Sequence, residues 1–212
     1  KTIDKATFER NKEAALSESK YVISCMNTDK ACIFTDTGRL HLIKITDMPF
    51  GRFRDKSIPL DNLGNYDSSG ENIIHICNLA SIQDSMMLFA TKTGMLKLVK
   101  GSEFDVSKRT VAATKLADGD SIIAICTADN FNQLVLQTEN GYFIRFPMMN
   151  IPEMKKTAIG VRGMKLGDGD QVENVYYTKN AVETTIEYKG KELILNNLKL
   201  GKRDSKGTKV RV

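Results

Sequence analysis

The chain has 212 residues, of which 31 are basic and 26 acidic, so its net charge is +5 at neutral pH. Hydrophobic residues make up 41% of the chain, enough for a buried core, and no run approaches the roughly 18 consecutive apolar residues of a membrane-spanning helix. Two histidines and four cysteines without a C-x-x-C pair argue against a zinc site, a histidine-based catalytic site and a disulfide framework.

The N-terminal stretch shows no charged-then-apolar signal peptide pattern. It begins without a methionine, so we expect a piece of a longer protein. Only Thr7 to Ser19 favours a helix, through Glu13-Ala14-Ala15-Leu16. The cysteines lie inside apolar runs, as expected of free thiols in a reduced, cytoplasmic protein.

The rest of the chain repeats the phrase Thr-x-x-Gly, which follows an apolar run at 35–38, 91–94 and 138–141, with a degenerate copy at 185–190. The four glycines are 56, 47 and 49 residues apart. A second phrase, Ser-Gly-Glu or Asp-Gly-Asp, ends at Glu71, Asp120 and Asp170 with nearly the same period. The first phrase predicts hairpin turns in which glycine supplies a positive φ, and the second predicts further turns. Two phrases with one period predict a supersecondary unit copied in series.

Strand-like runs rich in β-branched residues accompany the phrases, at 72–77, 121–126 and 133–137. Four strands in a unit of roughly 50 residues is typical of a propeller blade. The sequence therefore predicts an all-β, propeller-like array of about five four-stranded blades. We expect one domain over 1–212, with approximate units 1–20 (partial), 21–69, 70–116, 117–166 and 167–212.

Positive charge is concentrated in four segments at similar positions of the repeat: 50–60, 97–115, 145–165 and 196–212. They hold 19 basic and 5 acidic residues, whereas the remainder holds 12 basic and 21 acidic. Such a stripe predicts a polyanionic partner, because Lys and Arg bind phosphates and release condensed counterions. Gly160 and Gly207 beside the cations allow the backbone to approach phosphate. The chain has no tryptophan and no aromatic ladder for stacking single strands, so duplex is the predicted form.

Four motifs occur in order and with the spacing of one family: Phe34-Thr35-x-x-Gly38-Arg39, Leu88-Phe89-Ala90-Thr91-Lys92-Thr93-Gly94-x-x-Lys97, Thr138-x-x-Gly141-Tyr142-x-x-Arg145-Phe146, and Gly160-Val161-Arg162-Gly163-Met164-Lys165-Leu166. In these motifs the chain resembles the C-terminal DNA-wrapping domain, or β-pinwheel, of the A subunits of bacterial type IIA topoisomerases, gyrase and topoisomerase IV. The resemblance covers essentially all 212 residues, and the last motif is the most specific.

The resemblance implies blades that exchange strands and double-stranded DNA that bends around a basic outer rim. It also implies a non-catalytic fragment of an isomerase whose cleaving tyrosine and ATPase lie elsewhere. The implied partners are the ATPase B subunit and the remainder of the A subunit; ATP and Mg²⁺ serve the whole enzyme, and no cofactor or membrane is expected for this fragment. The implied location is cytoplasmic, on the nucleoid. The predicted DNA contacts are Arg52, Arg54, Lys56, Lys108, Arg109, Lys155, Lys156, Arg162, Lys165, Lys202, Arg203, Lys206 and Lys209.

An enzymatic alternative rests on two carboxylate pairs, Asp118 with Asp120 and Asp168 with Asp170. A calcium loop needs more acidic ligands at alternating positions and a closing glutamate, so we interpret both pairs as turns. No Walker sequence is present. No catalytic or metal-binding residue is predicted.

Gyrase carries a glutamine-arginine-glycine-lysine box upstream of its first full blade, and the corresponding stretch here is Phe8–Ala15. This stretch lacks paired glycines and contains an acidic residue, while the later run Gly201–Gly207 echoes the box with Asp204 and Ser205 in place of glycines. The sequence therefore favours topoisomerase IV, which presents a transport segment for decatenation and relaxation, over gyrase, which wraps DNA for negative supercoiling. A protein-interaction propeller is a further alternative, although the Trp-Asp signature of that class is absent.

Overall fold

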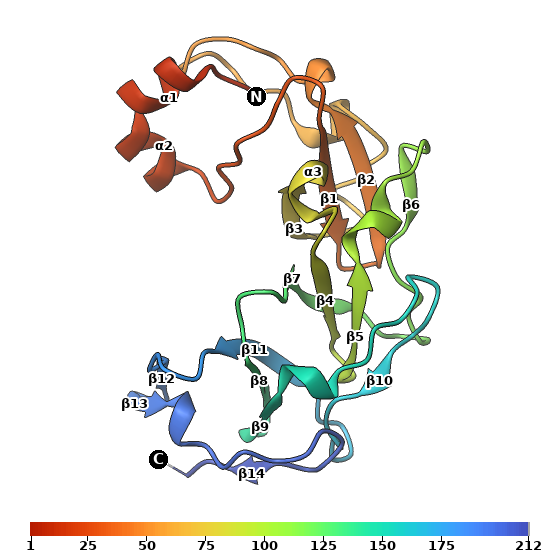
Figure 1. The fold of residues 1–212 in the computed structure, drawn as a ribbon, viewed down its shortest axis with the longest axis vertical. Coiled ribbons are helices and arrows are strands. Elements are labelled where there is room, and N and C mark those ends of the chain that lie inside the picture. Colours follow the sequence, from red (N-terminus) through yellow and green to blue (C-terminus); the bar gives the residue numbers. More distant parts are fainter. Residues whose placement is uncertain (212) are drawn as a thin grey trace.

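The structure is a computed structural model that describes residues 1–211. Three four-stranded antiparallel sheets and a two-stranded hairpin follow one another along an open arc (Figure 1). Two short helices lie at the N-terminal end of the arc and the two-stranded hairpin lies at the other end, both on the left of the picture. No helix within residues 1–211 is long and apolar enough to cross a membrane.

The sheets are numbered here in chain order. Sheet 1 has the order β3-β1-β2-β6, sheet 2 the order β10-β5-β4-β7, and sheet 3 the order β11-β8-β9-β14. The strands of sheet 1 are β1 (Lys30–Thr35), β2 (Arg39–Lys44), β3 (Ile73–Asn78) and β6 (Thr110–Ala112). Those of sheet 2 are β4 (Met86–Thr91), β5 (Met95–Lys100), β7 (Ile122–Thr127) and β10 (Val161–Arg162). Those of sheet 3 are β8 (Gln133–Thr138), β9 (Tyr142–Pro147), β11 (Val172–Thr178) and β14 (Thr208–Lys209).

The remaining hairpin consists of β12 (Thr185–Tyr188) and β13 (Lys191–Ile194). The helices are α1 (Lys5–Arg10), α2 (Lys12–Glu18) and α3 (Leu79–Ile82), and the short 3-10 helices are η1 (Ile45–Asp47), η2 (Leu60–Asn62), η3 (Gly101–Phe104), η4 (Met148–Asn150) and η5 (Leu195–Asn197).

Neighbouring units exchange strands. β6 follows the β4–β5 hairpin along the chain but pairs with β2 of sheet 1. In the same way β10 pairs back with β5, and β14 pairs back with β9. Each sheet is therefore completed by residues of the following unit, as the resemblance implied.

The exchange gives each sheet an inner and an outer edge. The edge strands β3 and β7 contact each other, as do β7 and β11, so these three strands line the inner side of the arc. β6, β10 and β14 are the opposite edge strands of the same sheets and lie on the outer side (Figure 1).

The two repeated phrases of the sequence meet in the structure. Gly94 closes the Thr-x-x-Gly turn with φ +80°, in the left-handed region that favours glycine. The carboxylate of Asp120, which ends the next Asp-Gly-Asp phrase, accepts hydrogen bonds from the N–H of Thr93 at 3.0 Å and from its hydroxyl at 2.6 Å. In sheet 3 the carboxylate of Asp170 accepts the N–H of Asn140 at 3.2 Å. In sheets 2 and 3 the second phrase is thus a turn that caps the first, which confirms the turn interpretation of both carboxylate pairs.

In sheet 1 a buried network replaces this cap. Oε2 of Glu71 accepts the hydroxyls of Thr35 at 2.7 Å and Thr37 at 3.1 Å, while Oε1 lies 2.7 Å from Nε2 of His41. Nδ1 of His41 lies 3.1 Å from the hydroxyl of Thr110 in the exchanged strand β6. The network therefore ties the first hairpin to a strand of the next unit.

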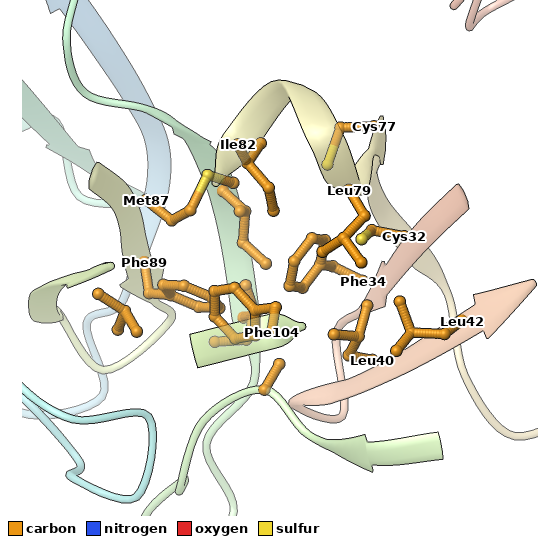
Figure 2. Packing of buried hydrophobic residues seen from close by; sticks show 14 residues of the cluster. Cys32, Phe34, Leu40, Leu42, Cys77, Leu79, Ile82, Met87, Phe89 and Phe104 are labelled. Carbon is orange, nitrogen blue, oxygen red and sulfur yellow. The ribbon is translucent and has the colours of Figure 1, made fainter. Parts of the chain in front are cut away.

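The apolar core lies between sheets rather than within one unit. Phe34 of β1 packs edge-on against Phe104 of η3, with ring centroids 5.2 Å apart, and against Phe89 of β4 at 6.0 Å (Figure 2). All three rings are buried, and burying one such side chain stabilises a fold by about 1.5–3 kcal/mol. A second cluster, which includes Leu88, Leu136 and Phe146, joins strands of sheets 2 and 3. Each unit is stabilised by its neighbour, as in other repeat proteins.

The all-β class and the helical stretch near residues 7–19 are confirmed, whereas the predicted number of blades is not. Residues 1–211 contain three complete four-stranded sheets rather than about five, and the first partial unit is helical. The predicted units 70–116, 117–166 and 167–212 each contribute strands to two sheets, whereas the unit 21–69 contributes β1 and β2 to sheet 1 alone. The third strand of each four-stranded sheet begins 36 to 43 residues after its first.

Candidate nucleic-acid interface

The candidate interface consists of the three outer strands β6, β10 and β14 with the segments around them, residues 105–112, 153–165 and 200–209. We call this surface the outer edge. Ten of the thirteen predicted contacts lie on it, and eight of these ten are exposed, while Lys156 and Arg203 are half-buried. The ten are Lys108, Arg109, Lys155, Lys156, Arg162, Lys165, Lys202, Arg203, Lys206 and Lys209.

The other three predicted contacts, Arg52, Arg54 and Lys56, are exposed in the segment after η1, which forms no strand. Isolated parallel bridges join Phe50 to Thr2, Glu153 to Leu98, and Leu200 to Arg145. Residues 50, 153 and 200 are thus equivalent, so this segment matches the beginning of the two later outer-edge segments. It rests on the N-terminal residues instead of on a sheet: Nζ of Lys1 donates to the carbonyl oxygen of Asp55 at 2.7 Å.

Three predicted contacts converge where the outer edges of sheets 2 and 3 meet. The guanidinium of Arg162 donates to both carboxylate oxygens of Asp204, and Nη1 of Arg203 donates to the carbonyl oxygen of Arg162 at 2.6 Å. The backbone N–H of Lys165 donates to the carbonyl oxygen of Ser205 at 3.0 Å. The hydrogen bond from Arg162 holds the pKa of Asp204 below its usual value. Residues 42 positions apart in the sequence therefore form one basic cluster around a single acid.

Asp204 also has an unusual backbone. Its φ of +67° lies in the left-handed region that favours glycine, and aspartate is one of the few other residues that enter this region readily. This is the position at which the sequence run Gly201–Gly207 has an aspartate instead of a glycine. The side chain that this exchange adds is the partner of Arg162.

Glu103 of η3 holds the two lysines of the loop 155–158. Its carboxylate lies 3.3 Å from Nζ of Lys155 and accepts the backbone N–H of Lys156 at 3.0 Å, and its carbonyl oxygen accepts Nζ of Lys156 at 2.8 Å. Burial raises the pKa of Glu103, but the hydrogen bonds from Lys156 and Lys155 outweigh it and hold the pKa below its usual value. This carboxylate is therefore a negative charge beneath two predicted contacts.

The acidic partners of the basic residues were not found by sequence reasoning. A third acid, Asp47, lies 3.8 Å from Arg109. In the sequence Glu103 and Asp204 are two of the few acidic residues within the basic segments. This position among cations is the only sequence signal for their ion pairs. Within residues 1–211, Lys108, Lys165 and Lys202 have no carboxylate partner. Nζ of Lys206 and Nζ of Lys209 lie 5.0 and 5.5 Å from the centre of the Tyr142 ring.

Two cations of the basic segments do not reach the outer surface. Lys97 is 1% exposed, and Arg145 is half-buried and donates to the carbonyl oxygens of Leu195 and Asn196. The positive charge that a ligand can reach is therefore smaller than the total positive charge of the four segments. In the described part of the chain, no group of three or more His, Cys, Asp or Glu side chains is placed to hold a metal ion.

Comparison with known proteins gives a consistent family. The family described as "DNA gyrase C-terminal domain, beta-propeller" matches residues 85–125 and 132–179. The A subunit of DNA gyrase from Chlamydia pneumoniae is 32% identical over 162 residues, which is 75% of this chain and 19% of that protein. Its counterpart from Lawsonia intracellularis is 29% identical over 194 residues, 89% of this chain and 23% of that protein. The chain thus spans about a fifth of the length of these curated relatives.

Solved structures share the fold. The C-terminal domain of a DNA topoisomerase IV aligns with a TM-score of 0.85 and 20% identity, covering 97% of this chain and 67% of that one. The C-terminal domain of E. coli ParC aligns with a TM-score of 0.77 and 17% identity over 91% of this chain and 80% of that one. A DNA gyrase A C-terminal domain aligns with a TM-score of 0.63 and 22% identity, over 87% of this chain and 60% of that one.

Proposed function

Since this chain is a C-terminal domain of a type IIA topoisomerase A subunit, we propose that it binds duplex DNA along the outer edge and bends it. In this proposal the domain itself cleaves no strand and hydrolyses no ATP. The cleaving tyrosine in the remainder of the A subunit, and the ATP- and Mg²⁺-dependent B subunit, would act on DNA that this domain presents. We place the work in the cytoplasm, on the nucleoid.

The observation that carries the proposal is the strand exchange. Because β6, β10 and β14 all lie at outer edges, cations from successive units line one side of a single arc. A duplex that follows the arc meets them in turn. Bending 20–30 base pairs costs about 1–6 kcal/mol, and roughly 6–10 phosphate contacts would offset that cost at moderate salt. The ten outer-edge cations are enough for this number of contacts.

We further propose the topoisomerase IV activities, decatenation and relaxation, in preference to negative supercoiling. The support is the stretch Phe8–Ala15, which has no paired glycines and lies in α1 and α2. The later echo of the box at Gly201–Gly207 carries Asp204, whose carboxylate binds Arg162. The gyrase alternative is favoured by the sequence identity to gyrase A subunits.

The first test is binding to a fluorescent duplex of about 40 base pairs of arbitrary sequence across a salt series. A log–log slope with a magnitude of about 5 or more is expected, because many phosphates would be engaged at once. Weak binding that is flat across the series would contradict the proposal and favour the protein-interaction propeller.

A second test separates the two topoisomerase roles. Nicked circular DNA is sealed by a ligase with and without the domain, and the change in linking number is measured on a gel. Bending without chiral wrapping is expected, so the topoisomer distribution should hardly move. A large shift of one sign would support the gyrase alternative.

A further inference from the structure

Lys97 lies in β5 and is almost fully buried, at 1% exposure. Its Nζ donates to three carbonyl oxygens of one loop: Lys155 at 3.3 Å, Lys156 at 2.9 Å and Ala158 at 2.7 Å. These are the three donors that an ammonium possesses. A single side chain thus gathers the carbonyls of the loop that carries two predicted DNA contacts.

The buried charge is costly and is not balanced by an ion pair. Within residues 1–211 no carboxylate forms a salt bridge with Lys97. Its compensation comes from the three carbonyl dipoles and from the face of Phe89, whose ring centre lies 5.6 Å from Nζ. The carbonyls must stay in place for the charge to remain satisfied, so the charge and the loop conformation depend on each other.

The fold itself does not require a lysine at this position. Lys97 pairs with Phe89 in sheet 2, and the residues at the same register are His41 in sheet 1 and Ile144 in sheet 3. Ile144 is a buried apolar residue of the core. In sheet 2 the equivalent residue is Lys97, and its side chain binds the loop 155–158, which leads to the outer strand β10.

A second contact fixes the loop from another element. Glu103 of η3 accepts the backbone N–H of Lys156 and lies beside the ammonium of Lys155, whose side chain remains 78% exposed. The loop is therefore held through its carbonyls by Lys97 and through an N–H by Glu103. Both contacts direct Lys155 outward on the segment that continues to Arg162.

We propose that Lys97 is a positioning residue for DNA binding: it contacts no DNA, and it holds the loop 155–158 in the conformation that presents Lys155 and Arg162 on the outer edge. The effect of Lys97 on DNA affinity rests on the proposed function. Its effect on the conformation of the loop does not. In the following unit, Arg145 likewise donates to two carbonyl oxygens, those of residues 195 and 196.

The test compares Lys97→Met, which removes the three donors at similar volume, with Lys191→Met, which removes one exposed lysine outside the basic segments. Hydrogen exchange of the free proteins is followed in residues 155–162, with β4 and β8 as folding controls. We expect exchange in the loop to accelerate about tenfold in Lys97→Met only. Affinity for the duplex of about 40 base pairs should fall about fivefold or more, against less than about twofold for Lys191→Met.

The outcomes separate the two ideas. Unchanged loop exchange in a folded Lys97→Met would overturn the positioning role. Faster exchange with an affinity loss equal to that of Lys191→Met would overturn the link to DNA binding. If the unmodified domain binds no DNA, the proposed function fails, while the exchange result still decides the role of Lys97 in the loop.

A second measurement needs no variant and serves if Lys97→Met does not fold. In protein labelled with ¹⁵N and ¹³C, a buried ammonium with three carbonyl acceptors exchanges its protons slowly with water. We expect one lysine ammonium signal with couplings to the carbonyl carbons of residues 156 and 158. The absence of such a signal below about pH 7, where solvent exchange is slow, would contradict the inference.

Discussion

The carboxylate of Asp120 accepts both the backbone N–H and the hydroxyl of Thr93, a residue 27 positions earlier in the chain. This double hydrogen bond joins the two repeated phrases of the sequence and links the entry of β7 to the turn between β4 and β5. Removing these hydrogen bonds tests whether the two repeated phrases stabilise the fold.

Asp120→Ala should lower the free energy of unfolding by about 1–2 kcal/mol, because it removes the two hydrogen bonds from Thr93 and a third from the N–H of Ser121 and leaves the N–H of Thr93 to water. Asp118→Ala is the matched control, since Asp118 is an exposed residue of the same turn. Urea denaturation followed by circular dichroism measures both variants. Equal stability of the two variants would mean that the phrase is repeated along the chain for another reason.

The outer edge can be tested by removing cations from different sheets at once. Lys108→Gln, Lys206→Gln and Lys209→Gln together should weaken duplex binding for every sequence and reduce the magnitude of the salt slope by roughly 2–3, about 0.9 for each phosphate that is no longer neutralised. The control removes the same charge elsewhere, at the exposed residues Lys12, Lys179 and Lys191. If both triple variants lose the same affinity, net charge and not the outer edge determines binding.

Asp204→Asn should strengthen duplex binding several-fold. The change releases Arg162 from its carboxylate partner, adds one unit of positive charge, and keeps a side chain that tolerates the left-handed backbone. Asp168→Asn, in an exposed turn outside the outer-edge segments, adds the same charge as a control. Binding is measured in the same salt series, and an affinity gain no larger than that of Asp168→Asn would contradict the competition between Asp204 and phosphate.

The buried pair of His41 and Glu71 should make sheet 1 sensitive to acid. Burial raises the pKa of Glu71, but the hydrogen bonds from Thr35 and Thr37 and the charge of His41 outweigh it and leave the pKa below the ordinary 4.5. A lowered pKa stabilises the fold above pH 4.5, and this stabilisation is lost as the pH falls through the pKa of the folded state.

Glu71→Gln should therefore cost about 1–3 kcal/mol near neutral pH. The difference from the unmodified protein should shrink as the pH falls below about 4. Urea unfolding at several pH values measures it, with the exposed Glu173→Gln as control. A difference that is independent of pH would show that Glu71 acts by shape and not by charge.

Lys97 should give a pH dependence of the same sign, but at alkaline pH. Burial lowers its pKa from 10.5 to about 8, against the opposing effect of Glu103. Because the folded pKa lies below that of the unfolded chain, the unfolded state binds more protons between these values. The stability of the unmodified protein relative to Lys97→Met should therefore rise between pH 8 and 10.5. The rise is on the order of 1 kcal/mol or more, measured by urea unfolding, and parallel pH profiles would contradict it.

Sequence patterns determined the parts of this protein that depend on near neighbours. The Thr-x-x-Gly phrase predicts its turns because Gly94 and its counterparts need a positive φ that other residues avoid. The repeat of about 50 residues predicts stacked all-β units, and the stretch near Glu13 predicts the N-terminal helices. Exposure of cations such as Lys108 and Lys165 also follows from their polar, turn-rich surroundings. Contact of these cations with DNA stays a prediction.

Only the tertiary structure decided how the units are joined. β10 and β14 are two residues long, so their own composition cannot specify a partner, and their pairing back to β5 and β9 depends on how whole sheets pack. Whether a charged side chain points to solvent or into the protein depends on the same packing. Lys97 and Lys155 look alike in the sequence, yet one is buried beneath three carbonyls and the other is exposed. The reason is that burial and ion pairing are set by atoms brought together from positions 42 to 61 residues apart, which a one-dimensional pattern does not encode.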